Sequence, residues 1–147
     1  MPKKQQDCYS GKKKTHTLKQ QLLIDIATGK ILCTYGCNGK KHDFKLFLKS
    51  GVRMLKQTVC LADSGYQGIE EIHSNALIPK KKSMKSPLKK QEKSYNRKLA
   101  RARVKVENVL AHLKKFRIFS GKYRNRKKRL GLRFNLISAI YNIELNL

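Results

Sequence analysis

The sequence predicts a mixed α/β domain that is extended by helices at its C-terminal end. Three patterns lead to this prediction: a β-hairpin near the start, a short apolar run that ends at Asp63, and a long amphipathic helix in the second half. The chain has 147 residues, of which 39% are hydrophobic, so it can bury the core of one ordinary domain. The predicted set of strands is short by one at the front.

The first third of the chain predicts a hairpin behind a polar segment. Residues 1–14 are polar and basic and are expected to form an exposed lead-in. Apolar positions that partly alternate predict a strand over Thr15–Ile26, and Ile31–Tyr35 predicts the returning strand. Thr28-Gly29-Lys30 supplies the tight turn between them. Asp25 is interpreted as a carboxylate of this turn.

The middle of the chain alternates helix and strand patterns. A helix is predicted from Asp43 to Leu48, with the aspartate near its N-terminus. The nearly continuous apolar run Thr58–Ala62 predicts a buried strand that ends at Asp63. A short helix over Gly68–Ser74 and a strand over Ala76–Pro79 are expected to follow.

The second half predicts helices separated by basic segments. Lys80–Lys93 is basic and is followed by a helix from about Tyr95 to Phe116, whose apolar positions recur in steps of three and four. A basic loop over 121–129 leads to a closing helix, Leu130–Leu147, which is apolar on several faces. On the long helix Arg103, Glu107 and Lys114 project within an arc of roughly 40° beside the apolar stripe.

The charge of the chain predicts a polyanionic partner. Lys and Arg number 35 against 9 Asp and Glu, which gives +26 at pH 7. Residues 1–79 hold 13 basic and 6 acidic side chains (net +7), and residues 80–147 hold 22 and 3 (net +19). Nucleic acid is therefore the expected partner, and the second half is the expected face. A structural RNA-binding protein would explain the charge equally well.

Two further classes are disfavoured. No apolar run is long enough to span a bilayer, and the basic N-terminus has no signal-peptide pattern, so no membrane partner and a cytoplasmic location are expected. Zinc binding by Cys33, Cys37 and His42 is disfavoured because no second pair of ligands follows at a suitable spacing. The cysteines are expected to be free thiols in a reducing cytosol.

Two carboxylates are candidates for chemistry. Asp63 ends a predicted buried strand, where α/β sheets place ligand sites, and Glu107 lies on a basic face of the long helix. Phosphodiester chemistry uses clustered carboxylates that hold divalent metal ions about 4 Å apart. The plainer interpretation is a capping aspartate and a surface pair of Glu107 with Arg103, and spacing by itself leaves both open.

Short motifs spread over nearly the whole chain occur in the order typical of one protein family. They are Tyr9-Ser10-Gly11-Lys12-Lys13-Lys14-x-His16-Thr17, Gly39-x-x-His42-Asp43, Leu61-Ala62-Asp63-Ser64-Gly65-Tyr66-Gln67-Gly68, Asn96-Arg97, Arg103-x-x-x-Glu107-Asn108-Val109 and Tyr123-Arg124-Asn125-Arg126. With these motifs the chain resembles the C-terminal part of bacterial insertion-sequence transposases. Those enzymes belong to the DDE superfamily, whose core is RNase H-like.

The resemblance implies a set of functional residues. Asp63 and Glu107 would be catalytic residues and would bind divalent metal, Mg²⁺ or alternatively Mn²⁺. Arg103 and Lys114 match the signature around the glutamate, whereas its tyrosine position holds Ala100. DNA phosphates would be contacted by Arg103 and Lys114 and by the basic loop residues Lys122, Arg124, Arg126, Lys127, Lys128 and Arg129. The intact enzyme would cleave DNA at element ends and transfer the strands to target DNA.

The chain departs from the family pattern at its front. The first catalytic aspartate of the family lies on an opening core strand, and nothing before Thr15 resembles it; neither Asp7 nor Asp25 matches. The resemblance therefore implies an RNase H-like core that lacks its first strand, with residues 15–147 as a partial catalytic domain. Its expected partners are DNA and either a second copy or an upstream-frame transposase segment. The alternative is a non-catalytic basic DNA-binding fragment or regulator.

Overall fold

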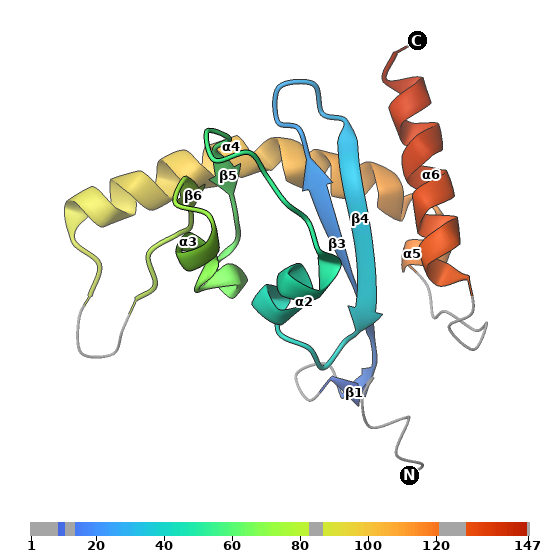
Figure 1. Cartoon of the computed structure of the whole chain (residues 1–147), viewed down its shortest axis with the longest axis horizontal. Helices are drawn as coiled ribbons and strands as arrows, with labels where there is room; N and C mark the ends of the chain where they lie inside the picture. Colours follow the sequence, from blue (N-terminus) through green and yellow to red (C-terminus); the bar gives the residue numbers. More distant parts are fainter. Residues whose placement is uncertain (1–8, 11–13, 83–86, 121–128, 147) are drawn as a thin grey trace. The chain divides into compact units, whose positions relative to one another are not determined.

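The computed structural model describes residues 9–10, 14–82, 87–120 and 129–146, drawn in colour in Figure 1. It divides into two compact units, the first made of residues 1–41 and 105–147 and the second of residues 42–104. Helices and three two-stranded sheets are present in the described residues, as the predicted mixed class requires.

The predicted hairpin forms the centre of the first unit. Strand β3 (Leu18–Ile24) pairs antiparallel with β4 (Ile31–Asn38), which continues beyond the predicted end at Tyr35. The predicted first strand was too long at its start, because Thr15–His16 forms a separate strand, β2, that pairs with β1 (Tyr9–Ser10). The lead-in interpretation missed β1, since two residues carry no readable alternation.

Asp25 closes the β3–β4 turn, as the sequence predicts. Its carboxylate accepts hydrogen bonds from the Thr28 hydroxyl (2.6 Å) and the Ala27 amide (3.0 Å). Gly29 adopts φ of +77°, a conformation that glycine reaches without strain. The Thr28 hydroxyl and the Ala27 amide lower the pKa of Asp25, because both donate to the ionised carboxylate.

The C-terminal part of helix α4 (Lys90–Lys114) and helix α6 (Leu130–Glu144) complete the first unit, because both share a buried cluster with β4. A buried cluster joins strand and helices through Ile31, Val109, Leu113, Phe134 and Tyr141. Helix α6 is also held to β4 by hydrogen bonds: the Asn142 amide exchanges two 2.8 Å bonds with the Ile31 backbone, and the Thr34 hydroxyl donates to the Asn135 side chain. A short helix, α5 (Arg117–Ser120), forms at residues for which the sequence predicts no element.

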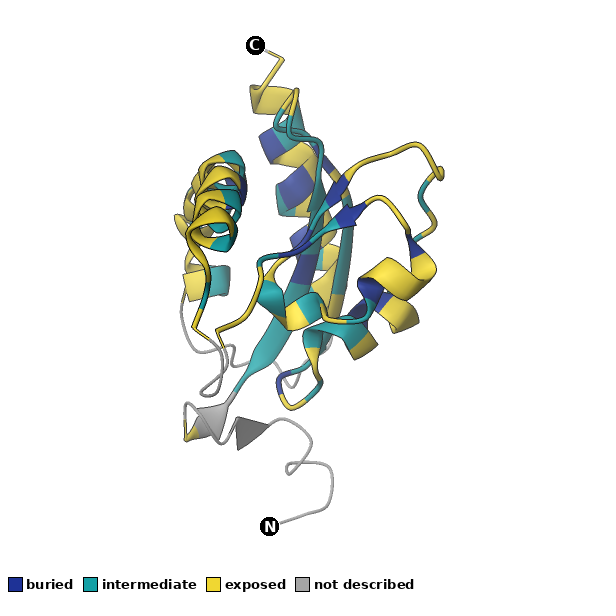
Figure 2. Cartoon of the chain, turned by 90° about the vertical axis from the view of Figure 1, so that its left-hand side faces the viewer, coloured by how far each residue is buried: buried dark blue, intermediate teal, exposed yellow. Residues whose placement is uncertain are grey.

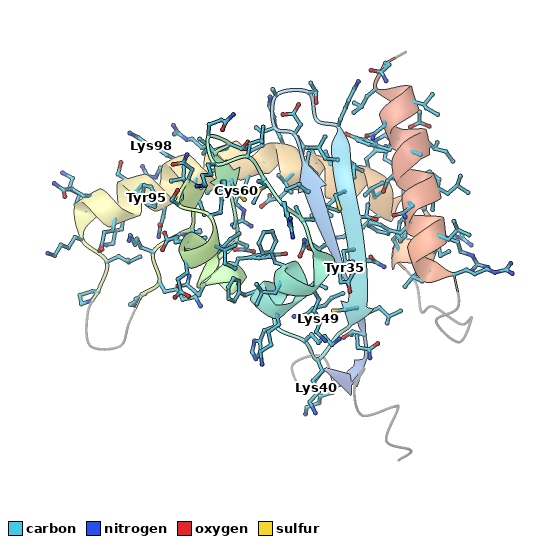
Figure 3. The ribbon with its side chains drawn as sticks, in the orientation of Figure 1. Tyr35, Lys40, Lys49, Cys60, Tyr95 and Lys98 are labelled. Atoms are coloured by element: carbon cyan, nitrogen blue, oxygen red, sulfur yellow. The ribbon has the colours of Figure 1, made fainter. Side chains whose placement is uncertain are left out.

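The second unit contains the parallel strands. Strand β5 (Cys60–Leu61) pairs in parallel with β6 (Ala76–Leu77). Helix α3 (Ile69–Ile72) lies in the connection between the two strands, and α2 (Asp43–Ser50) precedes β5 in the chain. Their core consists of Phe47, Cys60, Ala62, Ile69, Ala76 and Ile78. The predicted buried strand over 58–62 was too long: the Thr58 amide closes a turn onto the Leu55 carbonyl (2.9 Å), and the side chain of Val59 is 62% exposed. Burial raises the pKa of the Cys60 thiol (Figure 3).

Helix α4 (Lys90–Lys114) begins earlier than the predicted start at Tyr95. The cause is Glu92, whose carboxylate accepts a 2.9 Å hydrogen bond from the Lys89 amide just before the first turn. This is one half of a capping box, which satisfies an amide that the helix itself leaves without an acceptor. Figure 2 looks along α4 and shows exposed residues on one side and buried or half-buried residues on the other. In the described residues no helix is long and apolar enough to cross a bilayer.

We predict that Asp25→Ala lowers the melting temperature at neutral pH and that the difference from the parent protein shrinks in acid. The folded-state pKa of Asp25 lies below its ordinary value, so the stabilisation is present above the unfolded-state pKa and is lost as pH falls through the folded-state pKa. Melting curves followed by circular dichroism from pH 7 down to about pH 2 measure this. A difference that stays constant over this range would contradict the assigned turn.

We predict that Leu113→Ala lowers the free energy of unfolding by about 2–5 kcal/mol, because it opens a cavity in a packed core. The side chain of Leu113 is 2% exposed in the first unit. Leu132→Ala on α6 is the matched control, since that side chain is 66% exposed, and a change within about 0.5 kcal/mol is expected. Denaturant titration measures both variants, and equal losses would contradict the packing of α4 in the first unit.

Candidate active site

Asp63 stands where β5 ends and the chain turns into a short 3₁₀ helix, η1 (Ser64–Tyr66). Its backbone is extended, and its Oδ1 atom accepts a 2.6 Å hydrogen bond from the Ser64 amide. The aspartate is therefore the N-cap of η1, and this bond fixes the direction in which the carboxylate points. The side chain remains 54% exposed. It is thus both oriented and open to a ligand.

Arg103 of α4 pairs with Asp63 inside the second unit. Its Nη1 atom donates to Oδ1 of Asp63 at 3.1 Å, and the arginine side chain is 28% exposed. The sequence predicted that Arg103 contacts phosphate and did not predict this pair. Such an exposed pair contributes about 0–1 kcal/mol to stability, so its main effect is on the position of the carboxylate. The predicted phosphate contact of Arg103 stays a prediction.

The start of α2 lies directly against the loop that carries Asp63. A Cβ atom at Gly65 would lie 2.5 Å from Oδ2 of Asp43, and one at Gly68 would lie 2.9 Å from the ring of Phe44. Gly68 also has φ of +95°, which a side chain would strain. Both glycines therefore let the loop approach α2 closely. The sequence predicts a helix start at Asp43 but does not predict the contact of this residue with the loop. Gly65 and Gly68, which follow Asp63, could have indicated that another segment approaches this loop closely.

The other predicted residues of the site lie elsewhere or outside the described residues. His42 is the exposed N-cap residue of α2 and makes no capping hydrogen bond with its side chain. Glu107 and Lys114 are exposed on the part of α4 that belongs to the first unit. Because Asp63 belongs to the second unit, a shared site for Asp63 and Glu107 stays a prediction.

The predicted basic loop falls mostly outside the described residues. Lys122, Arg124, Arg126, Lys127 and Lys128 lie there, as does Asp7. Arg129 is described: it precedes α6 as its N-cap residue, with φ of +61°. Its predicted phosphate contact stays a prediction.

The donor chemistry of the two carboxylates suits a hard divalent cation. Asp63 and Glu107 both offer oxygen atoms that are open to solvent, and Mg²⁺ prefers oxygen ligands and keeps several waters. Within the described ranges no group of three or more His, Cys, Asp or Glu side chains is arranged to hold a metal ion.

Comparison with known proteins places the chain in a family. The sequence model of the family described as DDE superfamily endonuclease matches residues 1–142. The chain belongs to this family. It is 49% identical over 147 residues to the probable transposase for insertion sequence element IS702 of Microchaete diplosiphon, a match that covers 99% of this chain and 53% of that protein. The chain thus spans about half the length of this relative. No solved structure gives a significant match.

We predict that Gly65→Ala destabilises the second unit by about 1–3 kcal/mol, because the added methyl group would collide with Asp43. In an Asp43→Ala background the same substitution is expected to cost less, since the obstructing carboxylate is gone. Thermal unfolding of the parent protein, the two single variants and the double variant gives the double-mutant cycle. Gly131→Ala is the control, because among the described residues nothing outside its own helix backbone and chain neighbours lies within 4 Å of a Cβ at that position. Equal costs in both backgrounds would contradict the contact.

Proposed function

We propose that this chain is the part of an insertion-sequence transposase that carries two of its catalytic carboxylates. The whole enzyme would cleave DNA at the ends of its element and join the freed 3′ ends to target DNA. The observation that carries the proposal is the oriented, half-exposed Asp63 at the end of β5, in a chain that belongs to the DDE endonuclease family. The name of the IS702 relative and the charge of +26 support DNA as the substrate.

Each residue has a distinct role in this proposal. Asp63 and Glu107 would hold divalent metal, Mg²⁺ or alternatively Mn²⁺. Bound there, the metal would activate the attacking oxygen and stabilise the leaving oxygen of the phosphodiester. Arg103 would keep the Asp63 carboxylate in place and offer its remaining N–H groups to a phosphate, because a guanidinium has five donors and the pair uses one of them. Lys114 and Arg129 would add phosphate contacts.

The order of elements supports an RNase H-like core. An antiparallel hairpin (β3–β4) is followed by a helix and then by a parallel strand pair (β5–β6), with the candidate aspartate at the carboxyl end of β5. Ligand sites of α/β sheets lie at such ends. The family's first aspartate would then come from a strand outside these 147 residues and would complete the ligand set of the metal. The relative's greater length leaves room for such a strand.

We predict that the 147-residue chain does not cut transposon-end DNA and that an N-terminal extension which restores the first-aspartate strand does. Two carboxylates leave the metal ions incompletely held, so a loss on the order of a thousandfold or more in rate is expected without the third. Cleavage is measured on labelled end DNA with Mg²⁺ and with Mn²⁺.

Variants of the extended protein assign the roles. Glu107→Ala and Asp63→Asn should each abolish cutting while circular dichroism and DNA binding stay as in the parent protein. Asp25→Asn is the control, because that carboxylate is bonded within its own turn. Robust cutting by the 147-residue chain would show that the catalytic set is misplaced. An inactive extended protein that binds DNA would favour the binding-only alternative.

A further inference from the structure

The first half of α4 carries a row of basic side chains on its solvent side. In the second unit Leu99 is 7% exposed and marks the buried face of this helix. At 100° per residue, four exposed basic residues fall within an arc of about 80° roughly opposite Leu99. They are Lys90, Lys93, Arg97 and Arg101, called the α4 ridge below. With a rise of 1.5 Å per residue the ridge is about 16 Å long.

The charges of the α4 ridge are not neutralised by salt bridges within the described residues. No ion pair involves these four side chains in the part of the chain that the structure describes. The acids closest along the helix, Glu92 and Glu107, lie about 20° and 80° from Leu99, on the flank of the buried face and not on the ridge. In the described part of the chain the ridge is therefore a strip of positive charge that no salt bridge compensates.

A second basic segment is fixed beside the ridge. The side chain of Asn96 accepts a hydrogen bond from the Lys80 amide and donates one to the Lys80 carbonyl, both at 2.9 Å. This pair of bonds ties the chain at Lys80 to α4, one residue before Arg97. The exposed residues Lys81 and Lys82 follow Lys80 directly. The exposed Lys98, labelled in Figure 3, lies about 100° around the helix from Leu99, outside the arc of the ridge. By sequence, residues 80–93 form one basic stretch for which no contact with the rest of the fold is predicted.

The α4 ridge points away from the candidate active site. Arg103, which contacts Asp63, lies about 40° from Leu99, whereas the ridge lies about 120–200° from it. A phosphate bound at the ridge is therefore on a different face of α4 from a phosphate bound beside Arg103.

We propose that the α4 ridge is a duplex-DNA surface separate from the Asp63 site, which holds the backbone of a flanking or target duplex without reading its sequence. Long basic side chains on one helix face suit phosphates, and a duplex carries about one charge per 1.7 Å of its axis, so several lie within the length of the ridge. An anionic membrane is a poorer fit, because the apolar stripe of α4 is turned inward and cannot enter a bilayer.

This inference rests on the proposed transposase function, and its test needs no catalysis. Binding of the 147-residue chain is measured without metal over about 50–200 mM salt. The ligands are a terminal-repeat duplex, a random DNA duplex and an RNA duplex of equal length, and vesicles of anionic lipid. The ridge variant changes Lys90, Lys93, Arg97 and Arg101 to Gln, which keeps helix propensity. The control variant changes the exposed residues Lys45, Lys49, Arg53 and Lys56 of the same unit to Gln and so removes the same net charge.

The ridge variant is expected to lower the slope of log affinity against log salt by up to about 3.6 for both DNA duplexes alike, or about a hundredfold in affinity change over that salt range. The control variant should lose less than half as much. Circular dichroism should be unchanged in both. Equal losses in the two variants would overturn the inference, because net charge alone would then explain binding. A loss confined to the terminal repeat, or tighter binding of RNA or vesicles than of DNA, would overturn it as well. If the ridge binds DNA as expected but the N-terminally extended protein does not cut, the result would instead count against the proposed function alone.

Discussion

The loop that carries Asp63 depends on the burial of a small apolar core, because its strands are too short to hold it. Strands β5 and β6 pair over two residues each, and a sheet of that size is not stable through hydrogen bonds alone. Ile69, 1% exposed, and Phe47, 7% exposed, pack the helices α3 and α2 against these strands. Full burial of such side chains contributes about 1.5–3 kcal/mol each, which outweighs the net value of the few hydrogen bonds of the strand pair.

From this core the position of the carboxylate follows in short steps. Ala62 is buried and ends the apolar run, so the next side chain, Asp63, leaves the core at its edge. The Ser64 amide then orients the carboxylate, and Asp43, the first residue of α2, lies in close contact with Gly65. Arg103 supplies the opposite charge from α4. A half-exposed, hydrogen-bonded carboxylate of this kind is available to a cation without the cost of a buried charge.

Helix α4 separates two uses of positive charge within the second unit. On one face the charge of Arg103 meets Asp63, and on the opposite face the α4 ridge meets solvent. A chain of +26 repels itself, and charges spread along a solvated helix reduce that repulsion while they remain open to a polyanion. One helix thereby carries both the arginine that contacts Asp63 and the ridge that we propose binds a second stretch of DNA.

The sequence by itself determined the elements that depend on local patterns. The alternation of strand residues predicted the hairpin, steps of three and four predicted the long helix, and the end of an apolar run placed Asp63 at a strand end; each pattern acts over a few neighbouring residues. Boundaries were less predictable: α4 starts at Lys90, where the Glu92 carboxylate caps it, and β5 is short because Thr58 is held in a turn by the Leu55 carbonyl. Only the tertiary structure decided that Arg103 bonds Asp63, that Asp43 lies on Gly65 and that Asn96 holds Lys80. These contacts join residues far apart in the chain, and their geometry is set by how the helices pack on the strands, which no local pattern records.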